Sequence, residues 1–184
     1  MSDPALGVIE LSSIARGVQV ADAIVKRAPV RILQNHPISP GKFVIVFAGG
    51  VAEVDESMQA GLAVAASALL DRLFLPQAHE QLAPLLAGTR PEGPGTDAVA
   101  IVETVTVAST ILAADAAAKA ATVRLLDLRL GQGIGGKGFF TMTGDLESIE
   151  AAVGAGRSAI DAGNLLAVEI IPRPHEDLHA RLMW

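Results

Sequence analysis

The stretch Ala21-Asp22-Ala23-Ile24-Val25-Lys26 decides the fold, because it occurs twice in this chain of 184 residues. It returns 93 positions later as Ala114-Asp115-Ala116-Ala117-Ala118-Lys119. Around it, residues 5–33 align with 98–126, and most pairs that differ exchange one apolar residue for another. A repeat of this length means that one structural unit is encoded twice. The chain is therefore expected to fold as two similar domains.

The repeat continues toward the end of the chain with small changes in spacing. A shift of 95 places Gly41 on Gly136, and a shift of 96 places Pro76 on Pro172. The segment between the two copies is rich in Gly, Pro and Thr, which is typical of a loop. These observations predict a first domain at residues 1–87, a linker at 88–97 and a second domain at 98–184.

Both copies show the same succession of strand and helix patterns. In the first copy, Ser12 or Ser13 can cap a helix that Pro29 ends, and a turn is expected at His36–Gly41. The order β-α-β-β-α-β predicts an α+β fold of two tandem ferredoxin-like (split βαβ) domains, each an antiparallel sheet with helices on one face. The expected strands are 5–11, 31–34, 43–47, 69–75, 98–105, 123–130, 138–143 and 164–171, and the expected helices are about 12–28, 51–66, 76–86, 106–121 and 145–162.

The composition excludes several classes of function. The chain is 51% hydrophobic, carries a net charge of −6 and contains no cysteine. Scattered basic residues and few aromatic residues argue against nucleic-acid binding, which needs a basic face and stacking platforms. Without cysteine there is no disulfide, no zinc finger and no thiolate ligand for an iron–sulfur cluster. Because a small domain buries a limited share of its surface, the surplus of apolar residues indicates an oligomer.

Neither the N-terminus nor the apolar stretches of the chain indicate a membrane protein. The N-terminus Met1-Ser2-Asp3-Pro4 has no signal-peptide pattern. The longest apolar stretches, 43–52 and 60–70, are too short to span a bilayer. We therefore expect a soluble cytoplasmic protein.

Four signatures carry a resemblance to a known family. They are Ala5-Leu6-Gly7-Val8-Ile9-Glu10, the duplicated helix motif quoted above, the glycine turn before the third strand of each copy, and Ile171-Pro172-Arg173-Pro174-His175. With these signatures in order, each half resembles the bacterial microcompartment domain. The pair resembles the tandem, trimer-forming class of that family, and the match covers residues 5 to about 180.

The resemblance implies a structural shell protein and not an enzyme. Members of this class form pseudo-hexameric homotrimers that tile the shell around a central pore for metabolites. The implied partners are hexameric shell tiles, encapsulated enzymes and small metabolites, with no nucleic acid and no membrane. The implied location is the microcompartment shell in the bacterial cytoplasm.

The resemblance also gives three residues a role in assembly. By spacing alone, Lys26 and Lys119 form ordinary i,i+4 surface pairs with Asp22 and Asp115, worth a few tenths of a kcal/mol. The family places the matching lysine at the tile edge, and it places the arginine that matches Arg173 there as well. The first copy has Gln77 where the second has Arg173, so the trimer edges are expected to alternate in chemistry.

The glycine turns fall where the family lines its pore. The chain is similar to the propanediol-utilisation-type single-layer trimer, some members of which bind an iron–sulfur cluster through a cysteine at the position of Ser39. A hydroxyl is a poor cluster ligand, so we expect no cluster, no other cofactor and a pore ringed by serine hydroxyls. Three copies of His36 could meet to bind a metal, but a solvent-facing histidine is the simpler interpretation, and no metal is expected. The expected pore-lining residues are His36, Pro37, Ile38, Ser39, Pro40, Gly41, Gly133, Ile134 and Gly135.

Alternative functions remain open at this point. They are a small-molecule-binding regulatory trimer, a redox-carrying shell protein and an enzyme. Residues 131–136 fit the G-x-G-x-x-G pattern, but a strand pattern follows where a nucleotide site needs a helix. His79 and His175 occupy equivalent repeat positions, whereas an enzyme site usually breaks such symmetry. We therefore interpret these two histidines as structural.

Overall fold

The computed structural model describes residues 4–91 and 97–179, which form two compact units. The first unit contains the described residues up to Ala87 together with the turn Gly131–Gly136, and the second contains the others. Of the linker expected at 88–97, residues 92–96 lie outside the described residues. Each unit is built around one copy of the repeat.

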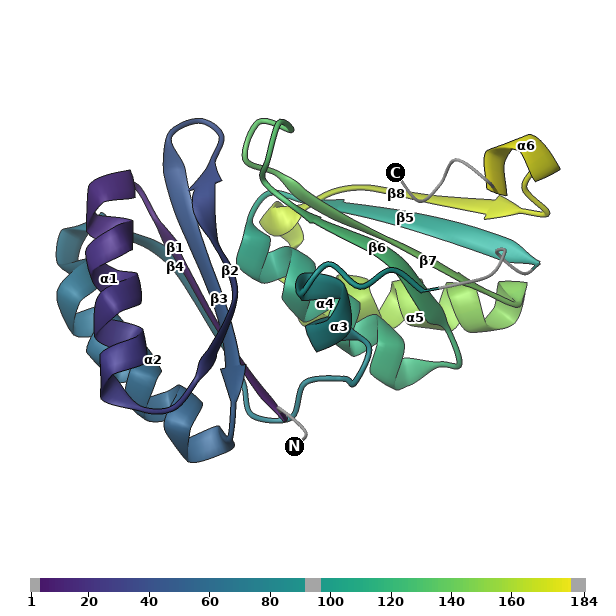
Figure 1. The fold of residues 1–184 in the computed structure, drawn as a ribbon. Coiled ribbons are helices and arrows are strands. Elements are labelled where there is room, and N and C mark those ends of the chain that lie inside the picture. Colours follow the sequence, from purple (N-terminus) through teal and green to yellow (C-terminus); the bar gives the residue numbers. More distant parts are fainter. Residues whose placement is uncertain (1–3, 92–96, 180–184) are drawn as a thin grey trace. The chain divides into compact units, whose positions relative to one another are not determined.

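The first copy folds as one four-stranded antiparallel sheet with two long helices. The strand order is β2-β3-β1-β4, which is the split βαβ arrangement that the sequence predicts. Helices α1 and α2 cover the same face of the sheet (Figure 1). The elements are β1 (Ala5–Leu11), α1 (Ile14–Arg27), β2 (Arg31–Ile38), β3 (Lys42–Gly49), α2 (Val51–Ala65), β4 (Leu69–Leu75) and α3 (Leu82–Leu86).

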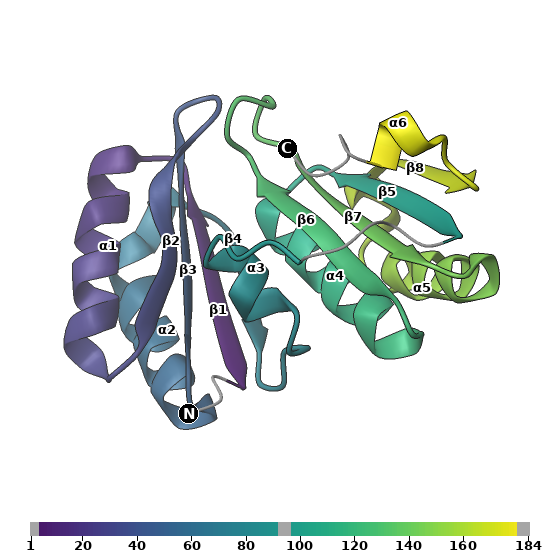
Figure 2. The ribbon, with the colours of Figure 1, turned by 45° about the vertical axis from the view of Figure 1, so that its right-hand side comes forward.

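The second copy repeats this fold. Its strand order is β6-β7-β5-β8, and α4 and α5 lie together on one face of the sheet (Figure 2). Short 3-10 turns, Ala66–Ala68 and Ala162–Asn164, precede the last strand of the sheet in both copies. The elements are β5 (Ala98–Thr104), α4 (Val107–Ala120), β6 (Arg124–Leu130), β7 (Gly138–Gly144), α5 (Leu146–Ala159), β8 (Leu165–Pro172) and α6 (Glu176–His179).

The core of the first copy lies between the sheet and its two helices. Alternate residues of a strand point to one face, and Ile9, Ile45 and Phe47 belong to one buried cluster with Val20 and Ile24 of α1. Each such side chain contributes about 1.5–3 kcal/mol when it leaves water. Helix α1 begins at Ile14. The preceding residue, Ser13, is its N-cap, and its side chain accepts a hydrogen bond from the Arg16 N–H. The repeat, the element order and this cap were all predicted from the sequence.

Two local predictions were wrong. Strand β2 runs to Ile38, so His36, Pro37 and Ile38 lie in a strand and not in the turn expected at His36–Gly41. Pro37 is tolerated because β2 is an edge strand, where a missing N–H can face away from the ladder. The short helix expected at 76–86 begins only at Leu82, and turns occupy residues 76, 77, 80 and 81.

No helix in the part of the chain that the structure describes is long and apolar enough to cross a membrane.

Candidate functional site

The first glycine turn joins β2 to β3. Gly41 has a φ of +86°, a conformation that favours glycine, and its N–H donates to the Ile38 carbonyl oxygen (3.0 Å). The Ser39–Pro40 peptide bond is cis. Pro40 and Gly41 are exposed and Ser39 is half-buried, whereas the Ile38 side chain is buried. Of the residues expected to line a pore from this turn, Ile38 therefore presents little side chain to solvent.

The second glycine turn, Gly131–Gly136, joins β6 to β7. Although it belongs to the second copy of the repeat, it is part of the first compact unit. Gly131, Gly133, Gly135 and Gly136 all have positive φ, which explains why four glycines occur there. Within this unit the Ser39 N–H donates to the Gly131 carbonyl oxygen (3.3 Å). The turn leads into β7 and not into a helix, so the nucleotide-binding pattern lacks the helix N-terminus that it needs.

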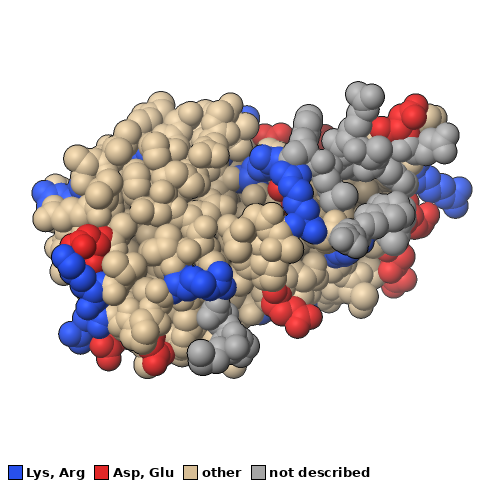
Figure 3. Space-filling model, viewed as in Figure 1, with Lys and Arg blue, Asp and Glu red and all other residues tan. Residues whose placement is uncertain are grey.

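A lysine next to each turn is paired with a glutamate. Lys42 Nζ lies 2.7 Å from Glu10 Oε1, and Lys137 Nζ lies 3.3 Å from Glu103 Oε2. The pairing recurs because the repeat places a lysine at the start of the third strand of each copy and a glutamate near the end of the first. Figure 3 shows a mainly uncharged surface over the β2–β3 hairpin. The lysines beside the turns are therefore largely compensated in charge.

The three residues expected at tile edges have different surroundings. Lys26 pairs with Asp22 (2.6 Å) on an open surface, and its side chain is 72% exposed. Lys119 makes the equivalent pair with Asp115 (2.5 Å), but Asp115 is buried. Arg173 is well exposed, has a φ of +49° and donates its backbone N–H to the Asp97 carbonyl oxygen (2.6 Å). Lys26 and Arg173 are therefore the freest of the three to reach a neighbour.

The donor set does not fit an iron–sulfur cluster. The position that would supply a thiolate holds Ser39, and the whole chain contains no cysteine. Across residues 4–91 and 97–179, no group of three or more His, Asp or Glu side chains is placed to hold a metal ion.

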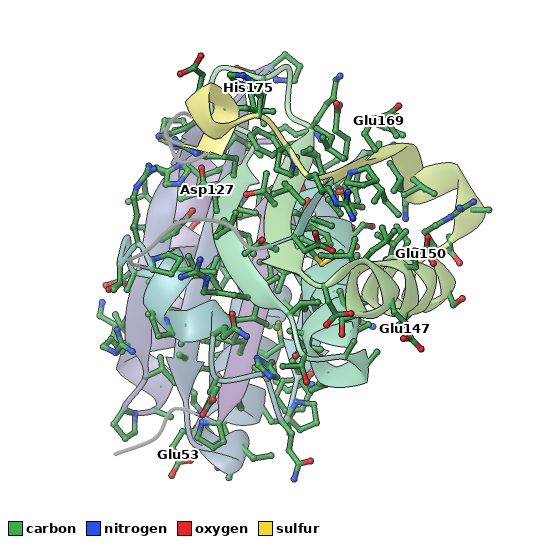
Figure 4. All side chains as sticks on the ribbon, turned by 90° about the vertical axis from the view of Figure 1, so that its right-hand side faces the viewer. Glu53, Asp127, Glu147, Glu150, Glu169 and His175 are labelled. Carbon is green, nitrogen blue, oxygen red and sulfur yellow. The ribbon has the colours of Figure 1, made fainter. Side chains whose placement is uncertain are left out.

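The histidines at equivalent repeat positions make the same local contact. His79 Nδ1 accepts a hydrogen bond from the Gln81 N–H (3.4 Å), and His175 Nδ1 accepts one from the Asp177 N–H (3.3 Å). Each ring therefore supports the chain just before a short helix. The labelled acidic side chains of the second unit come from β6, α5 and β8 and do not converge with His175 (Figure 4).

One series of hydrogen-bond contacts at β2 was not predicted from the sequence. Gln34 Nε2 donates to the Leu86 carbonyl oxygen (3.2 Å), and Gln34 Oε1 lies 3.0 Å from His36 Nε2. His36 Nδ1 lies 3.2 Å from the Pro37 carbonyl oxygen. Residues two apart in a strand share a face. The spacing of Gln34 and His36 is therefore the one feature of the sequence that indicates their contact. The contact with α3 depends on tertiary structure.

Comparison with known proteins explains the duplicated fold. A family model for the BMC domain, the bacterial microcompartment domain, matches residues 5–78 and matches again at 98–174. The chain belongs to the BMC-domain family. Both the family and the fold class that the sequence predicts are thereby confirmed.

Several shell and assembly proteins of microcompartments and carboxysomes match nearly the whole chain. The bacterial microcompartment shell protein PduT of Citrobacter freundii is 38% identical over 97% of both chains. The carboxysome assembly protein CcmO of a Synechococcus strain is 30% identical over 95% of this chain and 67% of its own. A solved microcompartment protein from Desulfitobacterium hafniense superposes with a TM-score of 0.89 at 42% identity, over 95% of this chain and 97% of its own. This tandem BMC-domain protein is a shell protein of a bacterial microcompartment.

Proposed function

We propose that three copies of this chain assemble as a pseudo-hexameric trimer that tiles the microcompartment shell, with the glycine turns around a central pore. The protein has a structural role in the shell and catalyses no reaction. Its partners are hexameric shell tiles and encapsulated enzymes, and small metabolites pass through the pore.

The observation that carries this proposal is a difference between equivalent helices. Val18 on α1 is 58% exposed, and the equivalent Ile111 on α4 is fully buried. Ile14 and Val25 are likewise exposed, whereas their equivalents Val107 and Ala118 are buried. The apolar side chains at these equivalent positions are thus exposed on α1 and buried on α4.

An open apolar face of this kind indicates an interface. A second copy of the chain is a suitable occupant, because both copies of the repeat carry apolar residues at these helix positions. A contact between an open face and a different surface of the next chain is heterologous, and such contacts form a ring when the rotation from one chain to the next closes. With two BMC domains in each chain, a ring of three chains imitates a hexamer.

The edge and pore residues complete the proposal. Lys26 at the end of α1 and Arg173 after β8 are exposed, which suits contacts between neighbouring trimers. Lys119 joins them at the edge, although its ammonium is shared with a buried carboxylate. Around the pore, Ser39, Pro40, Gly41, Gly133 and Gly135 offer small, uncharged surface to a passing metabolite. His36, Pro37, Ile38 and Ile134 complete the proposed lining, with Ile38 lying beneath the others.

Native mass spectrometry and electron microscopy of the purified protein test the proposal. We expect a trimer, and we expect sheets of trimers or incorporation into shells formed with single-domain partners. Lys26→Ala should weaken sheet formation while the trimer persists. A wild-type protein that stays monomeric and joins no shell would refute the proposed assembly, and loss of the trimer in Lys26→Ala would refute the edge assignment.

A further inference from the structure

His36 stands between two hydrogen-bond acceptors. Its Nε2 faces Gln34 Oε1 at 3.0 Å and its Nδ1 faces the Pro37 carbonyl oxygen at 3.2 Å. A neutral imidazole carries one N–H, and an imidazolium carries two. Only the protonated ring can therefore donate to both acceptors at once.

The orientation of the Gln34 amide is fixed from its other end. The Leu86 carbonyl oxygen accepts a hydrogen bond from Gln34 Nε2 (3.2 Å), and a carbonyl oxygen can face only the NH2 group of the amide favourably. The amide oxygen is thereby directed at His36. In the neutral ring the proton must then lie on Nε2, which leaves the lone pair of Nδ1 facing the Pro37 carbonyl oxygen.

We propose that His36 is a proton-operated latch on the turn that follows β2. Uptake of a proton from solvent at Nδ1 converts an unfavourable contact between a lone pair and a carbonyl into a second hydrogen bond. That bond ties the ring to Pro37, which is two residues before the turn Ser39–Gly41. The turn is thus held more firmly when His36 is charged. The contact is exposed, so solvent protons can reach it.

One ion pair lies on the face of the sheet that carries His36. In the sheet, Glu10 and His36 are both paired with Val44, so the three side chains share one face. Glu10 is already paired with Lys42 on that face (2.7 Å). Helix α3, which packs on β2, and the turn 131–136 contain no ionisable side chain. Protonation of His36 therefore adds a net positive charge beside the turns.

One consequence rests on the proposed function. In a trimer with the turns at a pore, lower pH would add one positive charge per chain near the opening and would favour the entry of anionic metabolites. The latch itself concerns one unit of one chain and stands without the pore.

Nuclear magnetic resonance of the full chain, with 15N-labelled histidine, tests the latch directly. At about pH 8, above the range in which histidine usually titrates, we expect the His36 ring in the Nε2–H form. On acidification to about pH 5, we expect the protection of the Gly41 amide from exchange to rise roughly twofold to tenfold after correction for intrinsic rates, as one added hydrogen bond predicts. A neutral ring with its proton on Nδ1 would overturn the proposal, and this measurement needs no variant.

Matched variants separate the latch from other effects of pH. His36→Gln cannot titrate, so the protection of Gly41 should become independent of pH, whereas His175→Gln should behave like the wild type. An unchanged pH response in His36→Gln would overturn the latch. A wild-type protein with the predicted tautomer that forms no trimer would leave the latch standing and remove only the proposed function.

Discussion

The carboxylate of Asp145 closes the N-terminus of α5. Asp145 Oδ1 accepts a hydrogen bond from the Ser148 N–H (2.8 Å), and Oδ2 accepts one from the Ser148 hydroxyl (2.7 Å). The backbone bond, and next the side-chain bond, lower the pKa of Asp145 below its usual value. The equivalent residue in the first copy is Gly50, which offers no side-chain cap to α2. The second copy thus has a charged cap that the first lacks.

We predict that this cap stabilises the fold more when it is ionised. The folded-state pKa of Asp145 is depressed, so its contribution is present above the unfolded-state pKa and is lost as pH falls through the folded-state value. Asp145→Asn keeps a good cap without the charge. Thermal unfolding should show the wild type more stable than Asp145→Asn at about pH 6, with the gap closing toward about pH 2. A gap that does not change with pH would contradict this assignment.

The two equivalent lysines should differ in their effect on stability. Lys119→Ala leaves the buried Asp115 with one partner fewer, which should cost on the order of 1–2 kcal/mol. Lys26→Ala removes an exposed pair and should change the free energy of unfolding by less than about 0.5 kcal/mol. Denaturant unfolding of both variants measures the difference. Equal costs would show that burial of Asp115 does not matter.

At the scale of elements, one glycine in α5 allows the two helices of the second copy to pack closely. A Cβ added at Gly156 would lie 3.0 Å from the Ala113 carbonyl oxygen of α4. Gly61 in α2 is the equivalent residue, and a Cβ there would lie 2.8 Å from Ile9 Cδ1. Both glycines therefore lie in helices where packing leaves little room for a side chain, and neither has a positive φ.

We predict opposite effects for two substitutions in this one helix. Gly156→Ala should destabilise the protein by about 1–3 kcal/mol through overpacking. Gly154→Ala, where a Cβ would meet no atom within 4 Å, should stabilise it by about 0.5–1 kcal/mol because alanine is the better helix former. Thermal or denaturant unfolding reports both signs. Stabilisation by Gly156→Ala would mean that the helices can move apart at no cost.

The order and type of the elements could be predicted from the sequence, because each pattern occurs twice and the copies reinforce each other. Strands Ala5–Leu11 and Leu69–Leu75 have the predicted bounds. The end of β2 was missed because Pro37 resembles a turn residue, and its tolerance depends on the position of β2 at the sheet edge. Local patterns do not reveal which strand is an edge.

The candidate site could be predicted only in part. The edge and pore residues follow from the resemblance to the family and remain predictions. The contact of Gln34 with Leu86 links residues 52 positions apart, so no local pattern contains it. The difference between α1 and α4 was also missed, since the two helices share a motif and differ in how many of their residues are buried.

At the scale of the whole molecule, the exposed face of α1 should control assembly. Val18→Glu places a charge in the middle of that face and should convert trimers to monomers. Val51→Glu makes the same change at another exposed valine, the first residue of α2, and should leave trimers intact. Native mass spectrometry at matched concentration distinguishes the two. If Val18→Glu still forms trimers, the trimer interface does not include this face of α1.

Because both modules lie in one polypeptide, a mutation reaches only half of the positions in a closed ring. A ring of single-module subunits must change all its positions together, which rules out any side chain that crowds or repels its own neighbours. The strand pairing places Arg129 at the position in the repeat that corresponds to His36, because His36 pairs with Val44 and Arg129 pairs with Phe139, the equivalent of Val44 in the second copy. In the proposed trimer an imidazole can thus alternate with a guanidinium group, and evolution can refine a ring whose every position could not hold the same group.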